Sequence, residues 1–460
     1  MTTKSTVLFI GASMLCASAF ASEVSMRIYD NTVFYDGYLL ENNPDRDLQD
    51  GIIRHTTSHY ATRLSDHVLD RMGATLRMDV TVSALCDNYD RIGNVNLAFV
   101  AKGQSSYNPA ECHRMELARF ITPFMNKNKK PNEVPYSFDL DNVSAILRDQ
   151  TLRDKYDFWL EFEIFGIPYA ANEQIAGCKD RNDVFAGTID FVTSDTPAGI
   201  STGNVLVPIV IKNPEYIGKN FNNYSEEATD QIGKAVKTYR FSVPEDVKNS
   251  QIVLIMSNPG ANVGGEEYNR RRHFVYIDDK EVMQFTPGRT SCEPYRAYNT
   301  QPNGIYGWSA MTDKQWQSFS NWCPGAEIPT RFISLGAMKA GDHSIRIEVP
   351  DAKFVDSQGD FPVSMYYQGS TDGSMIIGGI SSANEEDATP QVEVSVNGKT
   401  LTMRSRLAIA TTSIYDISGE CLYCGKSAEH TDISFLSPGI YIAVFATTDG
   451  NGEAHKIFVF

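Results

Sequence analysis

Three short segments of the sequence place carboxylates beside arginines or aromatic residues, and such groups can transfer protons. Carboxylates that lie close together raise one another's pKa, which suits a general acid or base. Each segment also has a purely structural interpretation, because aspartates form turns, carboxylates on a strand face solvent and charged runs usually lie on the surface. The three segments are residues 86–91, 156–166 and 264–273.

The first segment reads Cys-Asp-Asn-Tyr-Asp-Arg and ends at Asp90 and Arg91. It comes directly before residues 94–100, which alternate between apolar and other side chains and are predicted to form a strand. Asp90 and Arg91 are therefore expected at the mouth of a strand, where they either form a turn or face a site.

The second segment alternates regularly. Its apolar face begins with Phe158 and Leu160, and the opposite face carries Glu161 and Glu163. A register shift of two residues would keep both carboxylates on the same face, so the strand pattern does not distinguish between them.

The third segment begins with two glycines, continues with Glu266, Glu267 and Tyr268, and includes Arg271. Glycine lets a ligand approach the backbone closely, and a tyrosine could flank it. Glu267 is the preferred candidate, with Glu266 expected to be its solvated neighbour. An offset of one residue would exchange the two roles.

The loop at 289–333 is long and rich in Asn, Gly, Ser, Trp and Tyr, and it contains Cys292 and Cys323. A long loop needs to be tied down, and a disulfide does this in an oxidising compartment. The alternative is a decorated surface loop with a structural disulfide.

The N-terminus predicts export. Lys4, an apolar run at 7–19 and the sequence Ala19-Phe20-Ala21 are typical of a signal peptide cleaved after residue 21. Cleavage leaves seven of the eight cysteines, so at least one thiol stays unpaired. The pairing of the remaining cysteines is open, and zinc at the Cys-x-x-Cys sequence 421–424 is disfavoured because it would need two more ligands.

Composition indicates a well-packed protein, with 42% hydrophobic residues in 460. The net charge of −16 argues against nucleic acid as a partner. Many short strands separated by Gly, Pro and Asn turns predict an all-β fold, and the length predicts two sandwiches. The expected divisions are a signal peptide 1–21, β domains 22–194 and 195–380, a linker 381–389 and a small β domain 390–460.

These motifs resemble the peptide-N-glycosidase F family, whose members release N-linked glycans from asparagine. Trp-Cys-Pro-Gly at 322–325 and Ile-Pro-Thr-Arg at 328–331 are similar to its C-terminal half, as is the pair Cys292 and Cys323. Residues 86–91 are similar to its Cys-Asp-x-Trp-Asp-Arg motif, and residues 119–123 to its Arg-Phe-Ile-Thr-Pro sequence.

The resemblance implies two eight-stranded antiparallel jelly rolls with the active site at their interface. It implies a secreted amidase that acts on N-glycosylated proteins or peptides, here expected to be a monomer that needs no metal or cofactor. The implied catalytic residues are Asp90, Glu267 and Glu163. The implied substrate-binding residues are Arg91, Glu161, Tyr268, Arg271 and Trp322.

Some positions depart from the family pattern. Gly265 and Asn269 stand where the family has cysteines, and Phe319 stands where it has an arginine. The alternative function is therefore an N-glycan-binding protein that kept the fold and lost catalysis. A copper monooxygenase of related architecture is a third hypothesis, which the scattered histidines disfavour.

The segment 390–460 resembles the sorting domain of the type IX secretion system of Bacteroidota. The resemblance rests on Tyr-Asp-Ile-Ser-Gly at 415–419, Leu-Ser-Pro-Gly-Ile-Tyr at 436–441 and the terminal strand. It implies that this secretion machinery is a partner. The alternative is an accessory sandwich that binds carbohydrate or protein.

Overall fold

The described part of the computed structural model excludes the expected signal peptide and the expected linker. It consists of residues 23–39, 48–168, 170–195, 204–211, 232–233, 235–259, 265–301, 309–353, 361–371, 376–377, 392–397, 399–405, 409–416, 421–437, 439–447 and 452–459.

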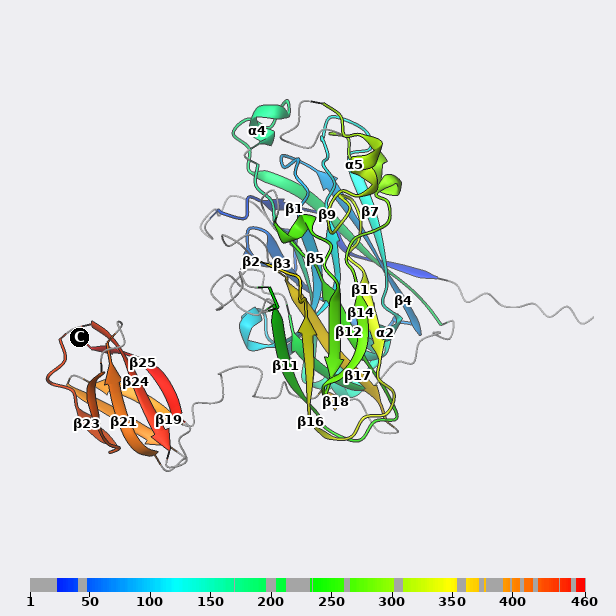
Figure 1. The fold of residues 1–460 in the computed structure, drawn as a ribbon. Coiled ribbons are helices and arrows are strands. Elements are labelled where there is room, and N and C mark those ends of the chain that lie inside the picture. The colour runs from blue at the N-terminus through cyan, green and yellow to red at the C-terminus, as the bar shows by residue number, and fades with distance from the viewer. Residues whose placement is uncertain are drawn as a thin grey trace, which may run out of the picture. The chain divides into compact units, whose positions relative to one another are not determined.

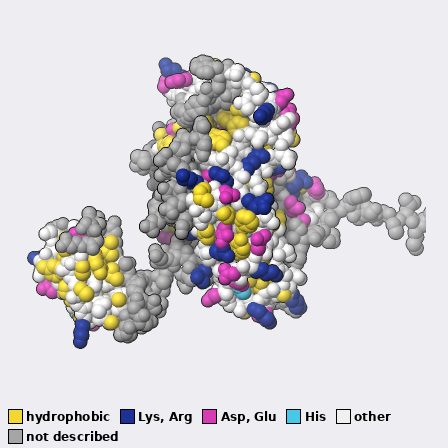
Figure 2. Space-filling view, viewed as in Figure 1, with side chains coloured by type: hydrophobic (Ala, Val, Ile, Leu, Met, Phe, Trp, Pro, Cys, Tyr) yellow, Lys and Arg dark blue, Asp and Glu magenta, His cyan; other side chains and the backbone are white. Residues whose placement is uncertain are grey.

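The chain forms two compact units, Met1–Gly379 and Ile380–Phe460, and both consist mainly of strands (Figure 1). No helix among the described residues is long and apolar enough to cross a membrane. On the face of the first unit drawn in Figure 2, basic and acidic side chains are interspersed around a group of hydrophobic ones.

The first half of unit one is a sandwich of two antiparallel sheets. One sheet has the order β1 (Val24–Tyr35), β9 (Asp183–Ser194), β4 (Thr75–Ala84), β7 (Glu133–Asp139). The other has the order β2 (Ile52–Thr56), β3 (His59–Arg63), β8 (Tyr156–Ile164), β5 (Ile92–Ala101), β6 (His113–Ile121).

The second half of unit one is a similar sandwich. One sheet has the order β15 (Thr330–Ser334), β12 (Asn249–Met256), β17 (Val363–Ser370), β10 (Val205–Val210), β18 (Ile376–Ile377), in which only the β10–β18 pair is parallel among the described strands. The other has the order β11 (Val236–Val243), β16 (Gly341–Glu348), β13 (His273–Ile277), β14 (Lys280–Phe285).

Unit two is a smaller sandwich with its own core. Its sheets have the orders β19 (Val392–Asn397), β20 (Thr400–Ser405), β23 (His430–Asp432), and β22 (Cys421–Lys426), β21 (Ile409–Tyr415), β24 (Gly439–Thr447), β25 (Gly452–Val459). Leu401, Ile414 and Phe445 are among its buried core residues.

The few helices are short and connect strands. The α-helices are α1 (Asp66–Leu69), α2 (Asp141–Arg148), α3 (Gln150–Lys155), α4 (Ala171–Gln174) and α5 (Asp313–Gln317). The 3-10 helices are η1 (Pro109–Glu111), η2 (Glu266–Tyr268) and η3 (Glu293–Tyr298). The all-β prediction is confirmed, although each large sandwich has nine described strands instead of the eight expected.

Strand β8 shows why the sequence pattern identified the core. Its apolar face is fully buried between the two sheets of the first sandwich, as the alternation predicted. The opposite face is buried too, since Glu161 and Glu163 are only 0% and 2% exposed. The interpretation of these carboxylates as solvent-facing residues is therefore wrong, because other groups cover this side of the sheet.

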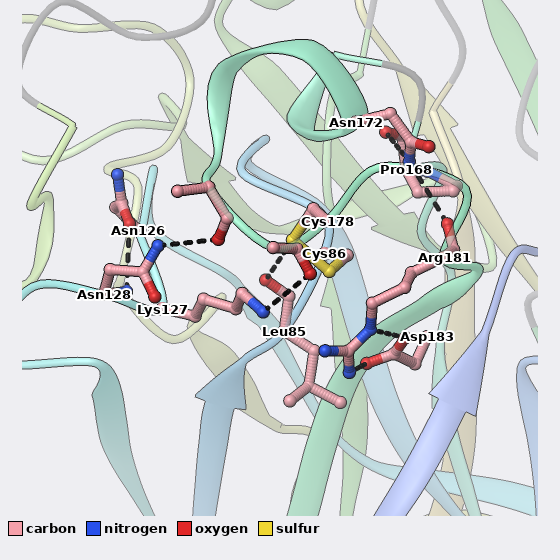
Figure 3. The surroundings of a disulfide bond; sticks show 12 residues. Leu85, Cys86, Asn126, Lys127, Asn128, Pro168, Asn172, Cys178, Arg181 and Asp183 are labelled. Atoms are coloured by element: carbon pink, nitrogen blue, oxygen red, sulfur yellow. Dashed lines mark hydrogen bonds and ion pairs between the residues drawn. A yellow bond between two sulfur atoms is a disulfide. The ribbon is translucent and has the colours of Figure 1, made fainter.

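Two disulfides tie the loops of unit one. The predicted bond between Cys292 and Cys323 is present, and a second joins Cys86 to Cys178. Figure 3 shows this second bond between the segment after β4 and the segment after α4, beside Lys127. Among the described cysteines, the thiols of Cys112, Cys421 and Cys424 are unpaired. The bond at Cys86 anchors the start of the segment that carries Asp90.

A buried ion pair joins the two halves of unit one. Arg119, on β6, is fully buried and donates through Nε and Nη2 to Glu116 at 2.8 and 2.7 Å. Its Nη1 donates to Ser257 Oγ at 2.7 Å and to the Pro362 carbonyl oxygen at 2.8 Å, both in the second half. Ser364 donates its hydroxyl to Glu116 from the same half. Arg119 therefore fixes the orientation of the second sandwich against β6.

Replacing Arg119 with leucine is expected to destabilise the protein by about 3–5 kcal/mol, because Glu116 would remain buried without its cation. Urea unfolding measures the change. Replacing Glu116 with leucine as well should restore much of the loss, since both charges are then removed together.

The matched control is Arg77→Leu. Arg77 lies on β4 with 46% of its side chain exposed and pairs with Asp79, so its loss is expected to cost about 1 kcal/mol or less. An Arg119→Leu variant that unfolds at the wild-type urea concentration would show that the network does not hold the halves together.

Candidate active site

Asp87 shapes the turn that presents Asp90. One carboxylate oxygen of Asp87 accepts from the Tyr89 backbone N–H at 2.9 Å. The other accepts from the Ile167 backbone N–H at 2.8 Å and from Arg91 Nε at 2.7 Å. Burial raises the pKa of Asp87, although Arg91 opposes this. The predicted turn-forming role of an aspartate in this segment therefore belongs to Asp87, which leaves the next aspartate, Asp90, for another role.

The Asp90 side chain forms a hydrogen bond with the second half of unit one. Its side chain is 9% exposed, and its Oδ2 accepts a hydrogen bond from Trp322 Nε1 at 3.1 Å. Burial raises the pKa of Asp90 to about 7, against the smaller opposing effects of Trp322 and Arg91. Asp90 can therefore both take up and release a proton near neutral pH.

Trp322 is held in place by apolar packing between the halves. It lies beside the Cys292–Cys323 disulfide and packs with Ile121 of β6, Ile255 of β12 and Ile328. Trp322 was predicted to contact substrate, but it is only 7% exposed and its indole N–H is used by Asp90. In this structure its indole N–H is directed at that carboxyl group.

Glu267 and Tyr268 lie on η2, and the charge of Asp90 reaches the Tyr268 hydroxyl. The Asn321 backbone N–H donates to the Glu267 carbonyl oxygen at 2.8 Å, which ties η2 to the residue before Trp322. Burial, the charges of Glu267 and Asp90, and a hydrogen bond with Glu267 all raise the pKa of the Tyr268 hydroxyl. Tyr268 thus lies within electrostatic range of both Glu267 and Asp90, and it remains 47% exposed.

Glu266 is not the solvated neighbour that the sequence predicted. It is 1% exposed, accepts from Arg271 at 3.0 and 3.1 Å, and accepts from the Lys353 backbone N–H at 2.9 Å. That expectation is wrong because the charged run forms its own buried ion pair. The Arg271 guanidinium, predicted to bind substrate, is the partner in this pair, and its side chain is 29% exposed.

The two carboxylates of β8 differ in their surroundings. Glu161 accepts from Arg114 at 2.5–3.0 Å, from Tyr107 at 2.8 Å and from Asn96 at 3.0 Å. Burial raises the pKa of Glu161, but Arg114 and His59 outweigh it and hold this pKa well below its usual value. Glu161 is therefore ionised, and its carboxylate accepts hydrogen bonds from side chains of the protein itself.

Glu163 lies closer to the segment that carries Asp90. It pairs with Asn94 across β8 and β5, and its neighbour Ile164 pairs with Gly93. Ile92, at the start of β5, packs against the cluster that contains Trp322. This position favours Glu163 over Glu161 as a residue of the site.

A row of aromatic rings in mutual contact begins at Arg91. The Arg91 guanidinium lies 4.6 Å from the centroid of the Tyr89 ring, and the Tyr89 ring lies 5.6 Å from that of Phe124. Phe124 in turn contacts Phe319, with centroids 5.7 Å apart. Phe319, which stands where the resemblance expected an arginine, therefore extends an apolar wall.

Sequence reasoning missed two groups. Asn88 is fully buried and donates to Gln174 of α4 and to Gln301, at 2.9 and 3.1 Å, which links the loops of the two disulfides. Among the described residues, one group could hold a metal ion, and it consists of His55, His59 and Glu161. Only the spacing of the two histidines across a turn could have indicated this group.

Comparisons with known proteins agree with this architecture. The family model of the N-terminal part of peptide-N-glycosidase F matches residues 25–179, and that of its C-terminal part matches residues 223–368. The two models together cover more than half of the chain. A search of the curated proteins finds no match to the sequence.

Solved structures share the fold at low sequence identity. Two structures of PNGF-II are 18% identical, with TM-scores of 0.56 and 0.57 over 76% of this chain. The alignments cover 66% and 65% of PNGF-II, so this chain spans slightly less than two thirds of its length. A structure of peptide-N(4)-(N-acetyl-beta-D-glucosaminyl) asparagine amidase is 15% identical, with a TM-score of 0.50 over 77% of this chain and 98% of the amidase.

Proposed function

This chain belongs to the peptide-N-glycosidase F family, and from that premise we propose that it hydrolyses the amide bond between N-linked glycans and asparagine. The observation that carries the proposal is Asp90, a buried carboxyl group with a pKa of about 7. It lies where the two sandwiches meet, within the electrostatic reach of the exposed Tyr268. A titratable group of this kind suits proton transfer at neutral pH.

In the proposed reaction, Asp90 takes a proton from water as the water oxygen attacks the asparagine side-chain carbonyl. The carbon–nitrogen bond then breaks, and Asp90 returns the proton to the leaving glycosylamine nitrogen. The peptide keeps an aspartate, and the glycan leaves as a glycosylamine. One carboxyl group serves both steps because its pKa lies near the working pH.

The neighbouring groups hold the substrate in the proposed complex. Glu267 orients the Tyr268 hydroxyl through their hydrogen bond, and the exposed ring of Tyr268 packs against a sugar face. Arg91, fixed by Asp87 and stacked over Tyr89, donates to sugar hydroxyls. We assign Glu163 to the floor of the site, on the sheet face that Ile92 shares.

Residues 1–21 are proposed to direct export and to be removed. The two disulfides are compatible with an oxidising compartment. Residues 22–194 and 195–380 are proposed as the two catalytic β domains. The domain at 390–460, with 381–389 as its linker, is proposed to engage a type IX secretion system, which fits a small β unit with a separate core.

The Trp322→Phe substitution tests whether the hydrogen bond from Trp322 lowers the pKa of Asp90. Removal of the indole N–H removes a hydrogen bond that lowers the pKa of Asp90. The pKa should therefore rise, and the limb of the pH–rate profile that reports Asp90 should move to higher pH. Activity measured across pH checks the direction of the shift. A profile that keeps its midpoint while the rate falls at all pH values would mean that Trp322 acts only through packing.

The function is tested by incubating the purified chain with a denatured N-glycosylated protein and weighing the products. Amidase action leaves aspartate at the glycosylation site and releases the whole glycan. A glycan-binding protein or an oxygenase would leave asparagine, and that result would refute the proposal.

A further inference from the structure

The outer face of the sheet β2–β3–β8–β5–β6 carries a compact group of histidines that the proposed reaction does not use. His55 and His59 come from the hairpin of β2 and β3, and their ring centroids lie 4.8 Å apart. Glu161 of β8 lies below them, with its Oε2 at 3.3 Å from His59 Nε2. The ligand atoms of these three residues all lie within 4.8 Å of one another.

The register of the strands explains why these side chains meet. Ala61 pairs with Ile53 on one side and with Glu161 on the other, so all three share a face. His59 is two residues before Ala61 and His55 is two residues after Ile53, so both histidines are on that face. The pairing between β2 and β3 has an irregularity between Arg54 and Thr56. A β-bulge of this kind re-aims a side chain, here that of His55.

The nitrogen atoms in this group are not fully satisfied. His55 Nε2 is buried and makes no hydrogen bond, and the same holds for Trp159 Nε1. His59 Nε2 is buried and makes no hydrogen bond of ordinary geometry, although it lies 3.3 Å from Glu161 Oε2. His59 is 1% exposed. A neutral imidazole has one ring nitrogen with a lone pair to offer to a metal ion. Buried polar atoms without partners are unfavourable unless a water, ion or ligand satisfies them.

The carboxylate has the support that a ligand needs. Tyr107, Asn96 and Arg114 donate to Glu161 and fix its orientation, as hydrogen bonds to metal-binding carboxylates do. Arg114 also brings a positive charge, which opposes a dication. The site should therefore prefer an ion that binds imidazole strongly over one, such as Ca²⁺, that depends on carboxylates.

We propose that His55, His59 and Glu161 bind a divalent first-row transition-metal ion of the class of Zn²⁺. Such an ion binds nitrogen and oxygen ligands at about 2.0–2.2 Å, which places ligand atoms at most about 4.4 Å apart. The ligand atoms here lie within 4.8 Å of one another, and small rotations of the imidazole rings would bring them to the spacing that the ion requires. Because β3 and β8 pair His59 with Glu163, the ion would brace the strand that carries the candidate active-site carboxylate.

The test measures Zn²⁺ binding to the full chain by calorimetry and by metal analysis after dialysis. One equivalent is expected to bind and to raise the Tm. His59→Gln should abolish this binding, and His55→Gln should weaken it strongly. Tyr107→Phe, which removes one hydrogen bond to Glu161, is expected to weaken it by about 10- to 100-fold.

The matched control is His67→Gln, because His67 is exposed and lies outside the group. It should bind Zn²⁺ as the wild type does. Substitution with Co²⁺ separates this site from the exposed thiols of Cys421 and Cys424. A nitrogen- and oxygen-ligated ion gives a visible spectrum without the thiolate charge-transfer band.

Two outcomes would overturn the proposal. One is a wild-type chain that neither retains Zn²⁺ nor gains Tm with it. The other is a bound ion with a thiolate band that survives in His59→Gln. If His59→Gln is poorly folded, the comparison between wild type and Tyr107→Phe decides, since equal affinity for Zn²⁺ in both would contradict ligation by Glu161.

Discussion

Asp90→Asn is expected to lower kcat/KM for glycan release by roughly two orders of magnitude or more. Asparagine has nearly the same shape and can still accept from Trp322, but it cannot take up or release the proton. The fold should survive, since the substitution removes a buried ionisable group and keeps its hydrogen bond. Initial rates on a purified N-glycopeptide, with circular dichroism and Tm as checks of folding, measure the effect.

The matched control for this substitution is Asp79→Asn. Asp79 lies on β4 with 36% of its side chain exposed, where it pairs with Arg77. Its replacement should leave the rate unchanged. Turnover close to wild type in a folded Asp90→Asn protein would remove Asp90 from acid–base catalysis.

Glu267→Gln is expected to cut turnover strongly, by about tenfold or more, because it removes the charge that orients Tyr268 beside Asp90. The Tm should change little, since Glu267 is only partly buried. The comparison with Glu266→Gln is informative because the two neighbours differ in structure.

Glu266→Gln should act on stability instead. The change breaks a buried pair with Arg271 and is expected to cost about 1.5–3 kcal/mol. The rate per folded molecule should stay near wild type. If Glu266→Gln lowers kcat at unchanged Tm while Glu267→Gln is silent, the two residues have been assigned in the wrong order.

Local sequence patterns predicted what depends on neighbours along the chain. The alternation of β8 gave its core face correctly, because a strand places successive side chains on opposite sides wherever it lies. The loop at 289–333 similarly indicated the bond between Cys292 and Cys323, which the structure contains. In both cases the residues that determine the structural feature lie within a few tens of positions of one another in the sequence.

Packing between distant segments was not predictable in the same way. The structural alternative for Glu161 and Glu163 was a solvent-facing position, and it was wrong because a strand pattern shows which residues share a face but not what covers that face. Glu266 looked solvated because its partners, Arg271 and the Lys353 backbone, are fixed by the fold of the whole half. The pairing of Cys86 with Cys178 was open for the same reason, since their separation of 92 residues leaves no local signal.

The site could be predicted only in part. Segment 86–91 predicted a carboxyl group at the mouth of a strand. Only the hydrogen bonds of the structure show that Asp87 forms the turn and that Asp90 does not. Trp322 was predicted to be a site residue, but its hydrogen bond to Asp90 joins positions 232 residues apart and could not be predicted. The group of His55 and His59 depends on a strand irregularity that no sequence pattern showed.

Hydrolysis of the asparagine side-chain amide with Asp90 as acid and base can be followed in ¹⁸O-labelled water. An N-glycopeptide treated with the wild-type protein should yield a peptide with aspartate at the former glycosylation site, carrying one ¹⁸O in its side chain, and an intact glycan. Asp90→Asn should yield neither under the same conditions. A peptide that keeps asparagine, either unchanged or with a single sugar still attached, would contradict the account.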